Sequence, residues 1–159
     1  MKKLIVLSIL LSLSYSVDVF AQDSRALRAA RMSFNSAERN FNNEKHAEAA
    51  REYEIVINTI PATIDSRRYL EMRLESIIKL VDIYFYHRVN MSKACENVQL
   101  YSENMNLIRN QGTLRASALL KYQRVEQEFA TKHEPKCQSY KGIDSDMDRF
   151  KQRFEEEFE

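Results

Sequence analysis

The sequence predicts an all-α fold, and three observations support this. Apolar residues recur at steps of three and four along most of the chain, as they do on one face of a helix. No stretch alternates between apolar and polar residues as a half-buried strand would. The 159 residues include only two glycines and two prolines, and 30% are charged. Helices joined by short links satisfy all three features.

The first 21 residues have the layout of a cleavable signal peptide. Two lysines precede an apolar run over residues 4–13, and Ala21 occupies position −1 of a plausible cleavage site. An uncleaved membrane anchor is the alternative, but the run is too short to span a bilayer comfortably. No cysteine suited to lipidation lies near the cleavage site, and no later segment is apolar enough to span a membrane. We therefore expect a periplasmic or secreted protein, not a lipoprotein, whose mature part covers residues 22–159.

The charge of the mature part argues against nucleic acid as a partner. The full chain has 24 basic and 23 acidic side chains, and cleavage removes Lys2, Lys3 and Asp18. This leaves 22 of each sign, whereas a nucleic-acid-binding domain normally has a net basic surface. The length of the mature part suits a single domain with one continuous core.

The first predicted hairpin covers about residues 23–60. Its first helix spans about 23–42, and its second spans about 45–59. Pro61 ends the second helix because proline lacks the N–H group that a continuing helix needs. The inward positions of the two helices are Leu27, Ala30, Phe34, Ala37 and Phe41, then Ala49, Tyr53, Val56 and Ile60.

The central hairpin, about residues 66–109, has the widest apolar face. Its first helix, at least 69–85, is so apolar that it must be covered on more than one side. A turn at 89–92 leads to a second helix that packs back on the first, and Gly112 suits the left-handed conformation that ends such a helix. The two faces are Leu70, Leu74, Ile77, Ile78, Val81 and Phe85, then Ala94, Val98, Tyr101, Met105 and Ile108.

The third predicted hairpin covers about residues 113–158. It consists of a helix over 113–132, a connector over 133–142, and a last helix from about Asp144 onward. Short links force neighbouring helices to be antiparallel, so the prediction is six helices in three stacked hairpins.

Part of this pattern resembles the tetratricopeptide repeat family. Residues that match the family's spacing are Ala37, Ala49, Tyr53, Val56 and Pro61 in the first hairpin, and Ile78, Val81, Phe85, Ala94, Val98 and Tyr101 in the second. Asp82 departs from the family, which has a small residue there. Ala49 and Ala94 are 45 residues apart, whereas the repeat is about 34 residues long. The resemblance implies a short, degenerate helical solenoid.

The resemblance also implies a concave groove lined by the first helix of each hairpin. The residues expected to line it include Phe34, Phe41, Lys79, Ile83, Tyr86 and His87. Mixed aromatic and charged side chains suit an extended or helical peptide. Alternatively, Phe34, Phe41 and Ile83 are core residues.

Cys95 and Cys137 are the only two cysteines. A signal peptide would send them to an oxidising compartment, where disulfides persist. Antiparallel packing of the helices near them brings both to the same edge of the domain, so we expect a Cys95–Cys137 disulfide. Two free thiols or an intermolecular link are the alternatives.

The residues favour neither a metal site nor an enzyme. Asp144, Asp146, Asp148 and Glu155 match positions 1, 3, 5 and 12 of a calcium loop, but position 6 is an arginine where such a loop needs glycine. The capped start of a helix explains these acids better. The three histidines lack ligand-spaced partners, and no catalytic or cofactor motif is recognisable.

These observations favour an exported helical-repeat adaptor that binds another protein or peptide in the periplasm or cell envelope. The alternative is a structural subunit of an envelope assembly that self-associates as a homo-oligomer. The last sixteen residues hold seven acids and three bases, and Arg25, Arg28 and Arg31 mark the opposite end of the chain. An enzyme of unknown type is the third possibility.

Overall fold

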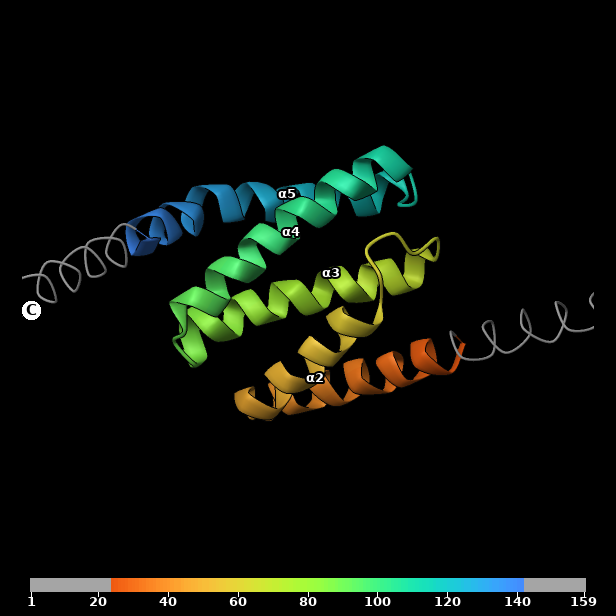
Figure 1. The fold of residues 1–159 in the computed structure, drawn as a ribbon, viewed down its shortest axis with the longest axis horizontal. Coiled ribbons are helices and arrows are strands. Elements are labelled where there is room, and N and C mark those ends of the chain that lie inside the picture. The colour runs from red at the N-terminus through yellow and green to blue at the C-terminus, as the bar shows by residue number, and fades with distance from the viewer. Residues whose placement is uncertain (1–23, 142–159) are drawn as a thin grey trace, which may run out of the picture.

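The computed structural model describes residues 24–141, and these residues contain helices and turns but no strand (Figure 1). The predicted signal peptide, the predicted helix from Asp144 and the acidic residues of the calcium-loop match lie outside this range. The all-α prediction is confirmed. The helical segments are residues 24–42, α2 (His46–Thr59), α3 (Arg67–Asp82), the π-helical turn η1 (Ile83–His87), α4 (Met91–Gln111), α5 (Ala116–Lys132) and residues 134–141.

Helix α3 lies at the centre of the fold. It packs against α2 on one side and α4 on the other, and α5 packs against α4 (Figure 1). Most of the predicted apolar face is fully or almost fully buried, namely Leu70, Leu74, Ile77, Leu80 and Val81, whereas Ile78 is half-buried. Because α2 and α4 cover different sides of α3, their backbones do not contact each other.

The π-helical turn at the end of α3 decides which neighbouring side chains face inward. The Arg88 N–H donates to the Ile83 carbonyl oxygen across 2.7 Å, five residues back. The wider turn buries three consecutive residues, Ile83, Tyr84 and Phe85, and leaves Tyr86 and His87 at the surface. Such turns accommodate one extra residue in a helical turn.

The predicted helix ends agree with the structure to within a few residues. Helix α2 ends at Thr59, two residues before Pro61. Helix α4 ends at Gln111, and the next residue, Gly112, adopts the left-handed conformation at φ 66°. The side chain of Asn90 caps the start of α4 by accepting from the Lys93 N–H across 3.1 Å. Helix α5 begins at Ala116, not at residue 113.

Residues 134–141 differ from the prediction, which made them part of a connector. They form a helical segment that follows α5 after a single turn residue, His133. Pro135 is compatible with this because it lies in the first helical turn, where N–H groups have no partner within the helix. The segment continues outward from α5 without folding back along it (Figure 1). The reversal expected for the third hairpin is therefore not made within the described residues, where α5 pairs with α4.

Cys95 and Cys137 form the predicted disulfide. Their Cα atoms are 5.5 Å apart, and 42 residues separate them in sequence. Cys95 lies on α4 and Cys137 on the helical segment 134–141, so the bond fixes the end of the described chain to the middle hairpin.

Arg73 is a buried cation that joins three helices. From α3, its guanidinium donates to the Ile57 and Ile60 carbonyl oxygens at the end of α2 and to Asn104 Oδ1 on α4. The distances to Asn104 and Ile60 are 2.7 and 2.6 Å. Burial lowers the pKa of Arg73. The charge is compensated by the carbonyl oxygens of a helix C-terminus, which carries partial negative charge.

Replacing Arg73 tests whether it holds the helices together. We expect Arg73→Met to lower the free energy of unfolding by about 3 kcal/mol, because it leaves two buried carbonyl groups and an amide without their donor. Arg68→Met, an exposed arginine on the same helix, should change it by less than about 0.5 kcal/mol. Urea denaturation followed by circular dichroism measures both. Equal effects of the two substitutions would contradict the role of Arg73.

Opening the disulfide should destabilise the fold without changing its helix content. Closing a loop of this length reduces the entropy of the unfolded chain, and the expected contribution to stability is about 4 kcal/mol. We expect Cys95→Ala/Cys137→Ala to lose about 2–4 kcal/mol of unfolding free energy. Dithiothreitol should destabilise the wild type by a similar amount and leave the double variant unaffected. If dithiothreitol also destabilised the double variant, its effect on the wild type could not be assigned to the opening of the disulfide.

Candidate binding surfaces

Several residues of the predicted groove form one strip across the first helices of the hairpins. The Phe41 ring meets the His87 ring edge-on at 6.0 Å between centroids. Lys79 Nζ lies 3.9 Å from the centroid of the Phe41 ring. Lys79 and Tyr86 also line a hollow against α5. We call Phe41, Lys79, Tyr86 and His87 the first-helix strip. Within it, Phe41 is half-buried and also packs against the core.

Two histidines stack at one end of the strip. His46, from the start of α2, lies 3.9 Å from His87 between ring centroids, with the rings inclined by 20°. His46 Nδ1 is buried and has no hydrogen-bond partner in the described part of the chain. His87 Nε2 lies 3.7 Å from Asp82 Oδ2. The aromatic surface around Phe41 is therefore built by three segments: the first helix, the start of α2 and η1.

The hollow at the other end of the strip lies between α3–η1 and α5, with a volume of about 220 Å³. Its floor and rim combine apolar groups with both signs of charge: Ile78, Lys79, Val81, Asp82, Tyr86, Val125, Glu128, Phe129 and His133. The Tyr86 hydroxyl lies 3.2 Å from His133 Nε2. Burial is the main cause of the lowered pKa of His133, and nearby Lys136 adds to it. The Tyr86 side chain is 55% exposed.

Two predicted groove residues lie elsewhere. Ile83 is fully buried, because the π-helical turn directs it into the core, and it cannot line an open surface. Phe34 is half-buried and packs edge-on against Tyr53 of α2 at 6.1 Å between ring centroids. It belongs mainly to the core between the first helix and α2.

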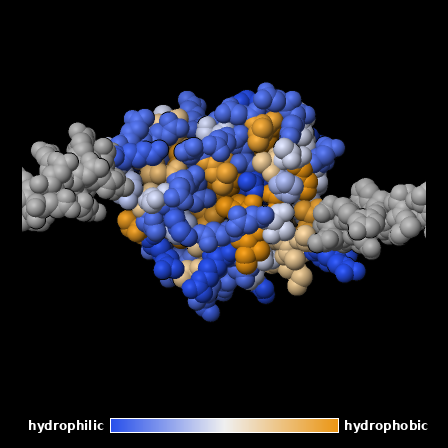
Figure 2. Space-filling view, viewed as in Figure 1, coloured by the Kyte–Doolittle hydropathy of each residue, from blue (hydrophilic) through white to orange (hydrophobic). Residues whose placement is uncertain are grey.

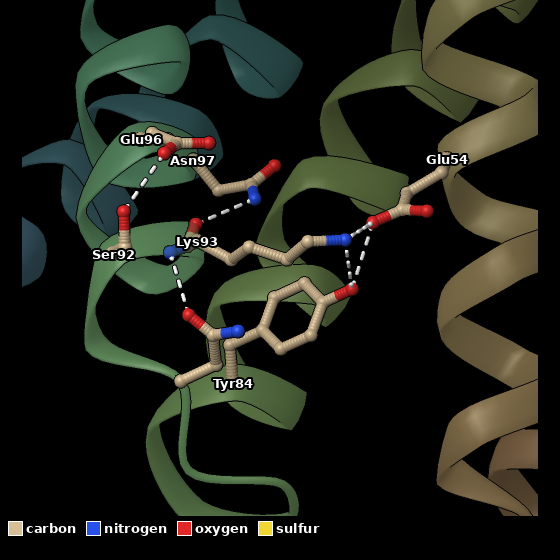
Figure 3. A network of polar contacts seen from close by, with 7 residues as sticks. Glu54, Tyr84, Ser92, Lys93, Glu96 and Asn97 are labelled. Atoms are coloured by element: carbon tan, nitrogen blue, oxygen red, sulfur yellow. Dashed lines mark hydrogen bonds and ion pairs between the residues drawn. The ribbon is translucent and has the colours of Figure 1, made fainter.

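A second candidate surface is the cleft between α2 and α4, with α3–η1 as its floor. A polar network crosses it (Figure 3). Lys93 Nζ of α4 lies 2.7 Å from Glu54 Oε1 of α2, and the Tyr84 hydroxyl of η1 donates to the same oxygen across 2.7 Å. Burial alone would raise the pKa of Glu54, but hydrogen bonds from Lys93 and Tyr84 outweigh it and lower the pKa. Burial and the bond to Glu54 raise the pKa of Tyr84.

The Glu54–Lys93 pair divides the cleft into two hollows. One, of about 240 Å³, lies toward Ile57 and Leu100. The other, of about 580 Å³, is lined by Ala47, Ala50, Arg51, Glu54, Tyr84, His87, Arg88, Val89, Asn90 and Lys93. We call this larger hollow the basic pocket. Figure 2 shows the same side of the molecule as Figure 1, with apolar residues gathered near the middle of a mostly hydrophilic surface.

Neither a metal site nor a membrane-spanning helix emerges from the described residues. Residues 24–141 contain no group of three or more histidine, cysteine, aspartate or glutamate side chains that could hold a metal ion. None of the helices in this range combines the length and the apolar character needed to cross a bilayer.

Comparison with known proteins gives no relative on which to base an assignment. No protein-family model, curated protein or solved structure matches this chain. The resemblance to tetratricopeptide repeats stays a prediction, and function has to be argued from the surfaces themselves.

The sequence pattern gives little sign of the network in the cleft. Glu54 and Lys93 are 39 residues apart, and each looks like an ordinary exposed charge on an amphipathic helix. Tyr84 lies next to Phe85 in an apolar stretch of the sequence and reads as one more core residue. Its hydroxyl was the one available signal, because a buried tyrosine hydroxyl usually needs a polar partner.

The lowered pKa of His133 predicts a pH dependence of stability. As pH falls through the unfolded-state pKa near 6.5, unfolded chains bind a proton that folded chains bind less readily, so the unfolding free energy decreases below about pH 6.5. His133→Phe keeps an aromatic ring among Phe85 and Phe129, which surround His133, but cannot titrate. Urea midpoints at about pH 7.5 and 5.5 should differ less for the variant than for the wild type. If the urea midpoint shifts equally between the two pH values in the wild type and the variant, groups other than His133 cause the pH dependence of stability.

Proposed function

We propose that this chain is an exported helical adaptor that binds a segment of another protein along the first-helix strip. The main support for this proposal is the position of Tyr86. Its exposed side chain lies at the rim of a hollow formed by two helices that are far apart in sequence. Tyrosine is enriched at binding sites because one ring offers both apolar area and a hydroxyl.

The surroundings of Tyr86 favour a peptide over a small apolar ligand. The hollow borders a cation and two acids, Lys79, Asp82 and Glu128. It continues through Lys79 to the rings of Phe41 and His87. A strip of alternating rings and charges can hold side chains of an extended or helical segment at successive positions.

The disulfide supports export. Disulfides form and persist outside the reducing cytosol, and the Cys95–Cys137 bond agrees with the signal peptide predicted for the first 21 residues. An adaptor in the periplasm or cell envelope is the function most consistent with these features.

Site-specific crosslinking tests the proposal. The full-length chain is produced with a photoreactive phenylalanine analogue in place of Tyr86, and in a second sample in place of Leu120, a 56% exposed residue of α5 that does not line the hollow. Crosslinking is carried out in cell envelopes. We expect the Tyr86 position alone to give a defined crosslinked protein, which mass spectrometry identifies.

Substitutions then test the strip itself. Tyr86→Ala and Lys79→Glu should each weaken binding of the purified crosslinked partner at least about tenfold, the effect of losing a contact worth about 1.4 kcal/mol. Leu120→Ala is the matched control and should leave binding unchanged. Identical products from both crosslinking positions, or full binding by Tyr86→Ala, would contradict the proposal.

A further inference from the structure

The charges of the mature chain are divided unevenly along its length. Residues 24–141 hold 19 basic and 14 acidic side chains, a net charge of +5. Residues 142–159 hold three basic and seven acidic side chains, a net charge of −4. The first part therefore attracts the second, most strongly where it carries cations that no acid neutralises.

The basic pocket gathers such cations. Arg51 and Arg88 line it, both are exposed, and neither makes an ion pair with any described residue. Glu54 is the acid in its lining, but its carboxylate is already bound by Lys93 and the Tyr84 hydroxyl. The two guanidinium groups are thus left available for other carboxylates, which they can bind in a two-pronged geometry.

The pocket also exposes apolar area next to its cations. Val89 lines it and is 73% exposed, and Ala47 lies in the same lining. The last six residues of the chain, 154–159, interleave four glutamates with Phe154 and Phe158. Because one hollow offers guanidinium groups and an apolar side chain together, it matches this segment in both charge and apolar character.

The disulfide holds the start of the acidic segment close to the pocket. Cys137 Cα lies 5.5 Å from Cys95 Cα, and Cys95 is two residues along α4 from Lys93, which lines the pocket. Because consecutive Cα atoms are about 3.8 Å apart, the Cα atoms of Cys137 and Lys93 lie within about 13 Å of each other. Lys141, about one helical turn after Cys137, lies within about 20 Å of Lys93.

A second contact places residues 134–141 beside the same pocket. Lys136 Nζ lies 5.7 Å from the centroid of the Tyr86 ring, and the residue after Tyr86, His87, lines the pocket. Residues 134–141, the start of α4 and the start of α2 all lie toward the same end of the molecule (Figure 1). The acidic segment therefore begins at the end of the molecule where the basic pocket lies.

The length of the segment favours the pocket of its own chain over that of another molecule. Glu155, the first of the four glutamates, comes fourteen residues after Lys141. A flexible chain of this length has a root-mean-square end-to-end distance of about 20 Å, close to the distance to be covered. A tethered group within reach has an effective concentration in the millimolar range. A second copy, or an acidic peptide of another protein, would equal this only at millimolar concentration.

We propose that the acidic end of this chain, residues 154–159, occupies the basic pocket of the same molecule and closes it to other anionic ligands. The glutamates pair with Arg51 and Arg88, and a phenylalanine ring covers Val89. Because His87 belongs both to the pocket and to the first-helix strip, the bound segment also borders that strip.

Crosslinking within one molecule tests the proposal. A photoreactive phenylalanine analogue replaces Phe158 in the mature, disulfide-bonded chain. Equal amounts of light and heavy isotope-labelled chains are mixed at about 5 μM, far below the effective concentration of a tethered segment. Mass spectrometry should find crosslinks to residues 47–54 or 87–93 that join light to light and heavy to heavy only. The yield should fall at least about fivefold at 500 mM salt, because exposed charge pairs are screened.

Charge reversal tests which cations hold the segment. Arg51→Glu/Arg88→Glu should reduce the crosslinks to the pocket at least about tenfold. Adding Glu155→Lys/Glu156→Lys/Glu157→Lys to the same chain should restore them, since the charges of the segment and the pocket are then opposite again. Unfolding curves confirm that each variant is folded.

The matched control is Arg25→Glu/Arg28→Glu. These arginines are exposed and do not line the pocket, so their reversal should leave the crosslinks unchanged. Absence of crosslinks to the pocket residues overturns the proposal, as does an equal loss in the control. Crosslinks that join light to heavy chains assign the segment to a second copy and also overturn it. None of these outcomes bears on the proposed binding of a partner at Tyr86.

Discussion

The fold depends on a guanidinium group buried without a carboxylate partner. Arg73 reaches from the central helix α3 to the end of α2 and to Asn104 on α4. Taking a charge out of water is costly unless its hydrogen bonds are made inside. Here the carbonyl oxygens of a helix C-terminus accept them, and the partial negative charge there compensates the cation. The cost of burial can be recovered only when all three helices are in place, so this contact makes their arrangement cooperative.

The same contact explains why a cleft exists between α2 and α4. Both helices pack on α3, yet their backbones do not touch. Arg73 links them near the end of α2, and the Glu54–Lys93 pair links them from the middle of α2 to the start of α4. The two polar bridges thus join helices whose backbones stay apart. The basic pocket lies where the Glu54–Lys93 bridge closes one side of the cleft.

Sequence periodicity predicted the parts of the fold that local chemistry determines. The apolar faces of α2 to α5, the stop before Pro61 and the left-handed Gly112 follow from the residues at those positions. The disulfide followed from there being two cysteines and from antiparallel packing. Arg73 could not be predicted, because an arginine next to apolar residues looks the same whether its side chain leaves the helix or enters the core. The π-helical turn was missed because one extra residue in a turn leaves no compositional trace, and it placed Ile83 in the core. Residues 134–141 were misread because Pro135 suggests a loop unless it falls in a first helical turn.

The net charge of the whole chain also hides how the charges are distributed, which matters for function. A formal charge near zero excludes a strongly basic surface only if the charges are mixed evenly along the chain. Here the acids are concentrated after residue 141, and the part that folds around α3 is basic. Its two candidate surfaces differ in chemistry: the first-helix strip combines three aromatic rings with Lys79, whereas the basic pocket is lined by Arg51, Arg88 and Lys93. The two surfaces meet at His87, whose ring contacts Phe41 in the strip and also lines the basic pocket. A substitution at His87 therefore changes both surfaces at once, whereas Tyr86 and Arg51 each belong to one surface only.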